Sequence, residues 1–173
     1  PHLTWYVPQK YFDMYPLDEI VLPKTLASDL NDILDRHGKR VYGPSASWLR
    51  AEKYGRHKEA VQAYLATITF VDDCIGVLLD GLAQSEYADN TIVMLWGDHG
   101  WKLGEHNGWC KHTNFENDAN APLIIRSPKQ KAPGAKTKAL VEFVDIYPTL
   151  CDVAGLPKPS HLEGSSAAPL LDN

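Results

Sequence analysis

Two neighbouring residues near the middle of the chain, Asp98 and His99, have side chains that can bind a metal ion. They follow the apolar run 91–96 (TIVMLW), and the next residue, Gly100, lets the backbone turn sharply. A carboxylate suits Ca²⁺ or Mg²⁺, and an imidazole beside it also suits Zn²⁺ or Mn²⁺. One such pair is an incomplete site, so further ligands have to come from elsewhere. The same tripeptide is equally typical of a turn at a strand end, in which Asp98 caps the backbone.

Lys111 is a lone cation beyond this pair, in the segment WCKHTNF. An ammonium group is a compact donor for an oxyanion, although most lysines are simply solvated. His99, His106, Cys110 and His112 also lie close together in the sequence, and nitrogen and sulfur ligands suit Zn²⁺. Their spacing matches no common zinc motif, and His106 and His112 are equally typical of surface or packing residues. A non-catalytic metal-binding module therefore stays an alternative.

The segment 97–115 resembles the type I, formylglycine-dependent sulfatases, and within them it is most similar to the iduronate-2-sulfatase branch. The matching residues are Gly97-Asp98-His99-Gly100, Leu103-Gly104-Glu105-His106, Trp109-Cys110-Lys111, Asn114-Phe115 and Ala121-Pro122-Leu123-Ile124-Ile125. Supporting similarity lies in Pro1-His2-Leu3 and in the stretches 11–15, 64–82 and 162–171. The resemblance covers most of the chain, except the region near residues 36–55.

The resemblance implies roles for four side chains. Asp98 and His99 would be metal ligands, and the metal would be Ca²⁺ rather than Mg²⁺ or Zn²⁺. Lys111 would bind the sulfate oxygens, and His2 would hydrogen-bond the sulfate ester and help to protonate the leaving alcohol. Thr4 stands where relatives commonly carry a proline, so the loop after His2 is less rigid. The substrate would be a sulfate ester, for example a sulfated carbohydrate.

The resemblance also implies an α/β fold of the alkaline-phosphatase and sulfatase type, with α/β/α layers around a mostly parallel sheet. Residues 1–173 would form a single partial domain, the C-terminal portion of the catalytic domain. An incomplete sheet has an open edge, so we expect association through that edge or with the missing N-terminal half. Relatives are usually periplasmic, extracellular or lysosomal, and the sequence itself does not choose a compartment.

The nucleophile motif of the family, Cys/Ser-x-Pro-x-Arg, does not occur in this sequence. Its Cys or Ser is matured to formylglycine, and Cys74, Cys110, Cys151 and all the serines lack the required neighbours. The acidic pair 72–73 does not replace the family's metal-binding pair, because it lies in a predicted helix and not after a strand. We therefore expect the nucleophile upstream of Pro1 and an inactive isolated chain. The nearest alternative activity is that of a phosphoesterase or phosphonoesterase of the alkaline-phosphatase superfamily, usually with two metal ions.

The hydrophobic pattern predicts the elements that position these residues. Strands are predicted at 91–96, 123–125 and 139–143, and helices at 26–36, 61–82 and 145–154. Asp145 as N-cap, Pro148 in the first turn and Gly155 as the stop delimit the last helix. Residues 1–24 and 38–55 are predicted to be loops. Strands that alternate with helices indicate an α/β class, and the unbroken apolar run 91–96 indicates a buried parallel sheet.

The composition excludes several classes of function. The 173 residues are 44% hydrophobic and 23% charged, which is ordinary for a globular protein. The net charge of −5 and the absence of a basic stripe argue against a nucleic-acid partner. Because no apolar run is long enough to cross a bilayer, no membrane segment is predicted. Three cysteines without CxxC spacing argue against a disulfide framework.

Overall fold

The computed structural model describes residues 2–26 and 28–172, and the chain forms two compact units. One unit contains residues 1–81 and 97–121, and the other contains residues 82–96 and 122–173. The prediction of one partial domain over residues 1–173 stays a prediction. All four side chains with predicted chemical roles belong to the first unit.

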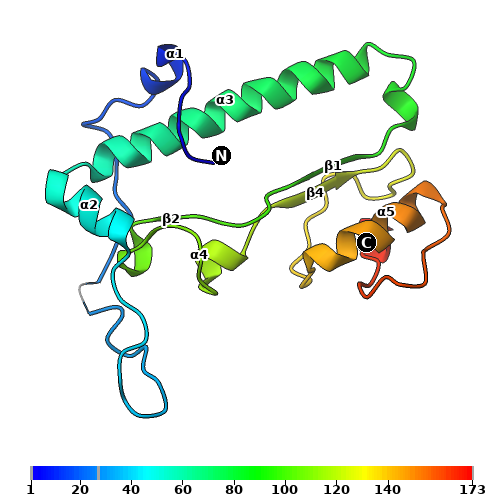
Figure 1. Cartoon of the computed structure of the whole chain (residues 1–173). Coiled ribbons are helices and arrows are strands. Elements are labelled where there is room, and N and C mark those ends of the chain that lie inside the picture. Colours follow the sequence, from blue (N-terminus) through cyan, green and yellow to red (C-terminus); the bar gives the residue numbers. More distant parts are fainter. Residues whose placement is uncertain (1, 27, 173) are drawn as a thin grey trace. The chain divides into compact units, whose positions relative to one another are not determined.

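The long helix α3 (His57–Ala83) is the main element of the first unit (Figure 1). It confirms the helix predicted over residues 61–82, since the apolar side chains recur at helical spacing. In its N-terminal half, Val61 packs with Ile20 and Trp109 in the core of this unit. The segment around Trp109 therefore packs against the first turns of α3.

Helix α2 (Ala46–Tyr54) precedes α3, so the loop predicted over residues 38–55 is wrong for this part. Ser45 begins the helix, because its hydroxyl accepts a hydrogen bond from the Trp48 backbone N–H at 3.1 Å. Gly55 ends the helix with a φ of 60°, in the left-handed region that favours glycine. No residue of α2 is buried, which explains why its hydrophobic pattern is too weak to predict it.

The N-terminal segment lies along α3 and contains the short helix α1 (Gln9–Phe12). The Tyr11 hydroxyl donates a hydrogen bond to Asp73 Oδ2 at 2.7 Å, and the Tyr15 hydroxyl lies 2.6 Å from Thr69 Oγ1. These bonds attach a mostly irregular aromatic segment to the helix. The acidic pair that includes Asp73 lies inside α3, as the sequence predicts.

The segment 97–121 folds into a small hairpin followed by a helical turn. Strands β2 (Lys102–Leu103) and β3 (Trp109–Cys110) pair in antiparallel orientation. Helix α4 (Glu116–Ala119) follows them. Because these elements are so short, the conformation of the segment depends more on side-chain contacts than on backbone hydrogen bonds between strands.

In the second unit, β1 (Val93–Trp96) pairs with β4 (Leu123–Arg126), as Figure 1 shows. The strands predicted at 91–96 and 123–125 are confirmed. Their orientation is antiparallel, so the prediction of a parallel sheet from the first of them is wrong for this pair. A continuous apolar run indicates that both faces of a strand are buried, but it does not predict the direction of the neighbouring strand.

Helix α5 (Ile146–Ala154) confirms the last predicted helix, with Gly155 at its C-cap. The strand predicted at 139–143 is wrong, since this stretch is irregular and leads into a 3-10 turn. Glu142 and Asp145 form a reciprocal capping box there, which favours a helical start over an extended strand.

The helix predicted at 26–36 is wrong for its described part. Residues 28–32 form turns, and Leu34 forms an isolated bridge with Arg40. The Asp35 carboxylate accepts hydrogen bonds from the backbone N–H groups two and four residues later, at 2.8 and 2.9 Å. Such local bonds offer the backbone an alternative to a helix.

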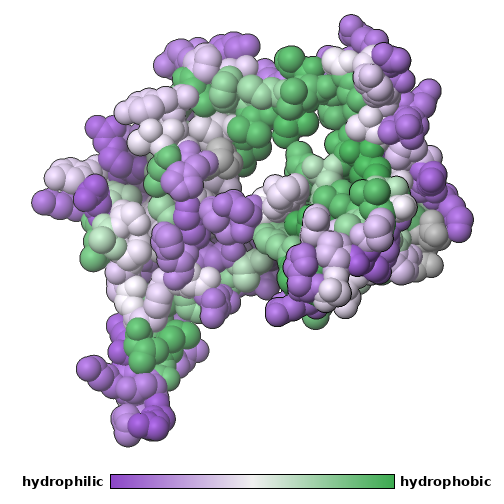
Figure 2. Space-filling model, turned by 45° about the vertical axis from the view of Figure 1, so that its right-hand side comes forward, coloured by the Kyte–Doolittle hydropathy of each residue, from purple (hydrophilic) through white to green (hydrophobic). Residues whose placement is uncertain are grey.

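The C-terminal half of α3 carries apolar side chains that remain exposed (Figure 2). They are Ile68, Val71, Val77, Leu78 and Leu79. A continuous apolar face of this kind is typical of a surface that another segment or subunit covers. In the described part of the chain, α3 included, no helix has both the length and the apolarity to cross a bilayer.

Candidate functional site

Asp98 and His99 form the first half of the candidate site, in residues 97–100, which we call the metal turn. Asp98 Oδ1 lies 3.5 Å from His99 Nε2, and the Asp98 side chain is 84% exposed. His99 Nδ1 lies 2.8 Å from the Gly100 carbonyl oxygen. Because a carbonyl can only accept a hydrogen bond, Nδ1 is placed to donate to it, and Nε2 faces the carboxylate.

This geometry fits a bound cation. Protein oxygen and nitrogen ligands bind divalent metals at roughly 2.0–2.6 Å, so two ligands 3.5 Å apart can share one ion. The hydrogen bond from Nδ1 to a carbonyl is the usual way in which a metal-binding histidine is oriented. Among the described residues, no group of three or more His, Cys, Asp or Glu side chains could hold a metal. The pair therefore needs ligands beyond those residues.

Gly100 fixes the metal turn against the backbone of α4. Its N–H donates to the Asp118 carbonyl at 2.8 Å, and a Cβ here would lie 2.0 Å from the Asn117 carbonyl oxygen. A side chain has no room at this position. The close approach of two backbones, and not a left-handed φ, is what requires glycine.

We expect Gly100→Ala to destabilise the complete protein by at least about 2–3 kcal/mol, because backbone atoms of α4 have to move away from the new methyl group. Urea unfolding measures the effect. Gly81→Ala is the matched control, since a Cβ at Gly81 meets nothing within 4 Å and alanine favours the helix. Equal stability of the two variants would contradict the packing described here.

Lys111 belongs to the second half of the candidate site, residues 109–113, which we call the lysine arm. Its Nζ lies 5.1 Å from the ring centroid of Trp101, and the Trp101 ring lies 6.0 Å from the His99 imidazole. The structure therefore brings Lys111 and the metal turn to the same indole. Cys110 and His112, on either side of the lysine, have positive φ values of 73° and 90°, which are strained for these residue types.

A buried ion pair that sequence analysis missed connects the two halves. Lys102 is 1% exposed, and its Nζ lies 2.5 Å from Asp118 Oδ2. The same carboxylate oxygen accepts hydrogen bonds from Thr113 N at 2.8 Å and from Thr113 Oγ1 at 2.6 Å. Burial raises the pKa of Asp118, but the hydrogen bonds from Lys102 and Thr113 outweigh it and hold the pKa below its usual range. Asp118 thus holds the lysine arm through Thr113 and the metal turn through its own carbonyl.

Among the described residues, no hydrogen bond or ion pair joins His2 to Asp98, His99 or Lys111. His2 is exposed, and its Nδ1 lies 2.6 Å from the carbonyl oxygen of Leu3. Three residues later, Trp5 lies 5.9 Å from the Trp101 ring. The segment that carries His2 therefore approaches the site, and the role of His2 itself stays a prediction.

The side chains that could form the alternative zinc site are placed separately in the structure. His106 Nδ1 lies 2.9 Å from Asp29 Oδ2, and its ring stacks on Phe115 at 4.0 Å. Burial raises the pKa of the Cys110 thiol, which disfavours the thiolate that a metal needs. His112 is exposed. Within the described residues these side chains pack separately and do not converge.

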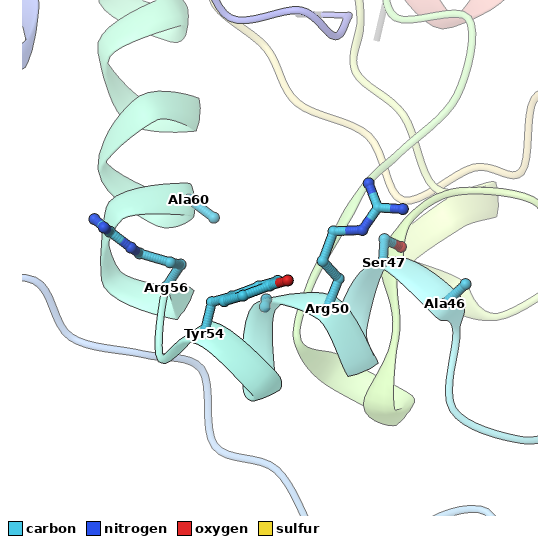
Figure 3. Close-up of a pocket in the computed structure, with 7 residues that line it drawn as sticks. Ala46, Ser47, Arg50, Tyr54, Arg56 and Ala60 are labelled. Atoms are coloured by element: carbon cyan, nitrogen blue, oxygen red, sulfur yellow. The ribbon is translucent and has the colours of Figure 1, made fainter.

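The groove shown in Figure 3 lies between α2 and the start of α3. It has a volume of about 620 Å³, and its lining includes Arg50, Tyr54 and Arg56. None of the four predicted site residues lines it. Arg56 is also neutralised by Glu59, at 2.8 Å, so we assign the groove no part in the chemistry.

Comparison with known proteins identifies close relatives. The family model described as "Sulfatase" matches residues 1–156. A sulfatase of Formosa agariphila is 42% identical over 99% of this chain and 34% of its own length. The iduronate 2-sulfatase of Mus musculus is 29% identical over 92% of this chain and 35% of its own length. The chain thus spans about a third of the length of the curated relatives it matches.

Solved structures share the fold. A protein in complex with its substrate D-glucosamine-2-N,6-O-disulfate matches 100% of this chain and 46% of its own, with a TM-score of 0.77 and 27% identity. The phosphonate monoester hydrolase of Silicibacter pomeroyi matches 99% of this chain and 35% of its own, with a TM-score of 0.80 and 26% identity. The predicted α/β fold of the alkaline-phosphatase and sulfatase type is confirmed.

Proposed function

Because this chain belongs to the sulfatase family, we propose that it forms part of a sulfuric ester hydrolase and supplies part of the active site. The observation that carries the proposal is the arrangement around Trp101, where the His99 ring and the ammonium of Lys111 lie against the same indole. A cation-binding pair beside a lysine is the arrangement that a sulfate monoester requires, since its oxygens carry negative charge during hydrolysis.

Family membership implies a metal ion and a formylglycine nucleophile. We propose that the metal is Ca²⁺, held by Asp98 and His99 together with ligands outside these 173 residues. A bound divalent cation would neutralise charge on the sulfate oxygens. The nucleophile motif is absent from the sequence given, so we propose that it lies in the preceding part of the complete protein. We expect the isolated chain to be inactive for that reason.

The side chains of this chain would act on both ends of the ester bond. Lys111 would donate hydrogen bonds to a sulfate oxygen and stabilise the charge that develops there. His2 would hydrogen-bond the ester oxygen and deliver a proton to the departing alcohol. Its exposed position leaves it free to do so once a substrate is bound.

We propose a sulfated carbohydrate as the substrate class. The N-acetylglucosamine-6-O-sulfatase of Bacteroides thetaiotaomicron is 39% identical over 68% of this chain and 21% of its own length. The structural relative bound to D-glucosamine-2-N,6-O-disulfate supports the same class. A phosphonoesterase is the second candidate, because the phosphonate monoester hydrolase shares the fold. Lys111 favours the sulfatase, since it can take the place of part of a second metal's charge.

We also propose that the rest of the complete protein covers the exposed apolar face of α3. This face includes Val77 and Leu78, which are 72% and 73% exposed. Apolar side chains at this level of exposure favour association. The partner would be the preceding part of the same domain, through this face or through an open sheet edge.

The proposal predicts that the complete protein hydrolyses an aryl sulfate faster than an aryl phosphate or an aryl phosphonate. Removal of divalent cations should abolish turnover, and Ca²⁺ should restore it better than Mg²⁺ or Zn²⁺. The isolated chain 1–173 is the negative control, because it lacks the nucleophile. Faster hydrolysis of the phosphonate, or two tightly bound metal ions in each protein molecule, would favour the second candidate.

A further inference from the structure

Trp101 contacts both halves of the candidate site. Its ring centroid lies 6.0 Å from the His99 ring, at an interplanar angle of 31°. Lys111 Nζ lies over the same indole, 5.1 Å from the centroid. His99 is two residues away in the chain, whereas Lys111 reaches the indole from beyond the β2–β3 hairpin. The indole therefore links the metal turn to the lysine arm by direct side-chain contact.

Two further rings restrict where the Trp101 indole can lie. Tyr64 of α3 stacks on it with centroids 5.7 Å apart and planes at 24°. Trp5 contacts it at 5.9 Å and 56°, and Trp5 also meets Tyr64 edge-on at 5.9 Å. Three mutually contacting rings come from three separate parts of the chain. Such a cluster gives the indole one favoured position, so its face is a fixed surface.

The indole N–H of Trp101 lowers the stability of the fold, and the cation over the ring gives a reason for tryptophan at this position. Nε1 is buried, and no described residue accepts a hydrogen bond from it. A buried donor without a partner lowers stability, so hydrogen bonding gives no reason for the indole N–H at this position. An indole, however, attracts a cation more strongly than a benzene ring does. Tryptophan thus suits this position because of the cation that lies over it.

We propose that Trp101 is a positioning residue that holds the Lys111 ammonium beside the metal turn, so that ammonium and metal act on one sulfate group. The inference rests on the proposed function and adds a residue to its machinery. Trp101 acts here through Lys111, and it needs no contact with the substrate.

The test compares Trp101→Leu and Trp101→Phe in the complete protein. Calorimetry gives the dissociation constant of inorganic sulfate, and kinetics with an aryl sulfate give kcat and KM. We expect Trp101→Leu to weaken sulfate binding and lower kcat by about 10-fold each, and Trp101→Phe by about 3-fold, from the usual strength of such contacts. Thermal unfolding should show that Trp101→Phe is still folded at the assay temperature. A purely structural tryptophan would instead give a phenylalanine variant with normal kcat.

A double-mutant cycle shows whether the effect passes through Lys111. In a Lys111→Ala background, Trp101→Leu should cause no further loss of sulfate binding. The same 10-fold loss in both backgrounds would overturn the inference. Tyr54→Leu is the matched control, because Lys53 Nζ lies 5.3 Å from the Tyr54 ring outside the candidate site, and it should leave sulfate binding unchanged.

The outcomes separate this inference from the proposed function. An unaltered protein that binds inorganic sulfate but hydrolyses no aryl sulfate contradicts the proposed function alone. Normal hydrolysis together with unchanged sulfate binding in Trp101→Leu contradicts the inference alone. An unaltered protein that binds no sulfate contradicts both.

Discussion

Asp98→Asn is expected to weaken binding of the divalent cation to the complete protein by about 100-fold or more, since even partners of metal ligands change affinity by about 10–100-fold. We expect kcat to fall by about 10²–10³-fold, as when one preorganised charge-stabilising group is lost. Asp98 is the only anionic member of the described metal turn. Its side chain is 84% exposed, so folding should not suffer. Calcium titration, aryl sulfate kinetics and thermal unfolding measure the three quantities.

Asp80→Asn is the matched control for this experiment, because it removes the same charge from an exposed position on α3. It should leave metal affinity and kcat unchanged. Unchanged calcium affinity in Asp98→Asn would show that Asp98 only caps the turn, which is the alternative that the sequence leaves open. A large loss of thermal stability would likewise contradict the exposed position of its side chain.

Lys102→Met is expected to destabilise the complete protein by about 3–5 kcal/mol at pH 7, because it leaves the Asp118 carboxylate buried without its cationic partner. The loss should be visible in urea unfolding. Lys53→Met, at an exposed position of α2, should change stability by less than about 0.5 kcal/mol. Adding Asp118→Asn to Lys102→Met should recover part of the loss, since the amide oxygen still accepts from Thr113 and carries no charge.

The effect of Lys102→Met should depend on pH. In the unaltered protein the pKa of Asp118 lies below its ordinary value, so its contribution to stability is present above pH about 4 and is lost as the pH falls through the folded-state pKa. In the variant, Lys102 no longer lowers the pKa of this carboxyl group, while burial still raises it against the Thr113 hydrogen bonds, so the pKa of Asp118 is higher than in the unaltered protein. The stability difference between the two proteins should therefore shrink as the pH falls from 7 to about 3. A difference that stays constant would contradict the role of Asp118.

Sequence alone predicted the elements with strong local signals. Helix α3 has a long apolar stripe, and α5 has a proline in its first turn and a glycine at its end. Helix α2 has its cap residues Ser45 and Gly55 but no buried face, so its pattern is weak. The segment 139–143 is rich in strand-forming residues, yet capping by Glu142 overrides that preference. The wrong predictions thus fall where local side-chain bonds outweigh the hydrophobic period.

The candidate chemical residues follow from their types and order in the sequence, whereas the residues that hold them in place do not. Asp98, His99 and Lys111 stand in a recognisable pattern, and the structure brings His99 and Lys111 to one indole. Lys102 looks like any surface lysine in the sequence, although it is 1% exposed. Its partner, Asp118, lies 16 residues later, and no periodicity connects the two. Contacts of this kind arise only when the segment is folded.

The bonds that converge on Asp118 have a consequence for how this segment can change in length. Thr113 is bonded to the Asp118 carboxylate, and Gly100 is bonded to its carbonyl oxygen. An insertion or deletion between residues 113 and 118 would pull one anchor away from the other and displace the lysine arm from the metal turn. The spacing between Thr113 and Asp118 is therefore restricted. The hairpin tip is restricted too, because His106 contacts Asp29 and Phe115, and a Cβ at Gly108 would lie 2.7 Å from Lys102 Cε.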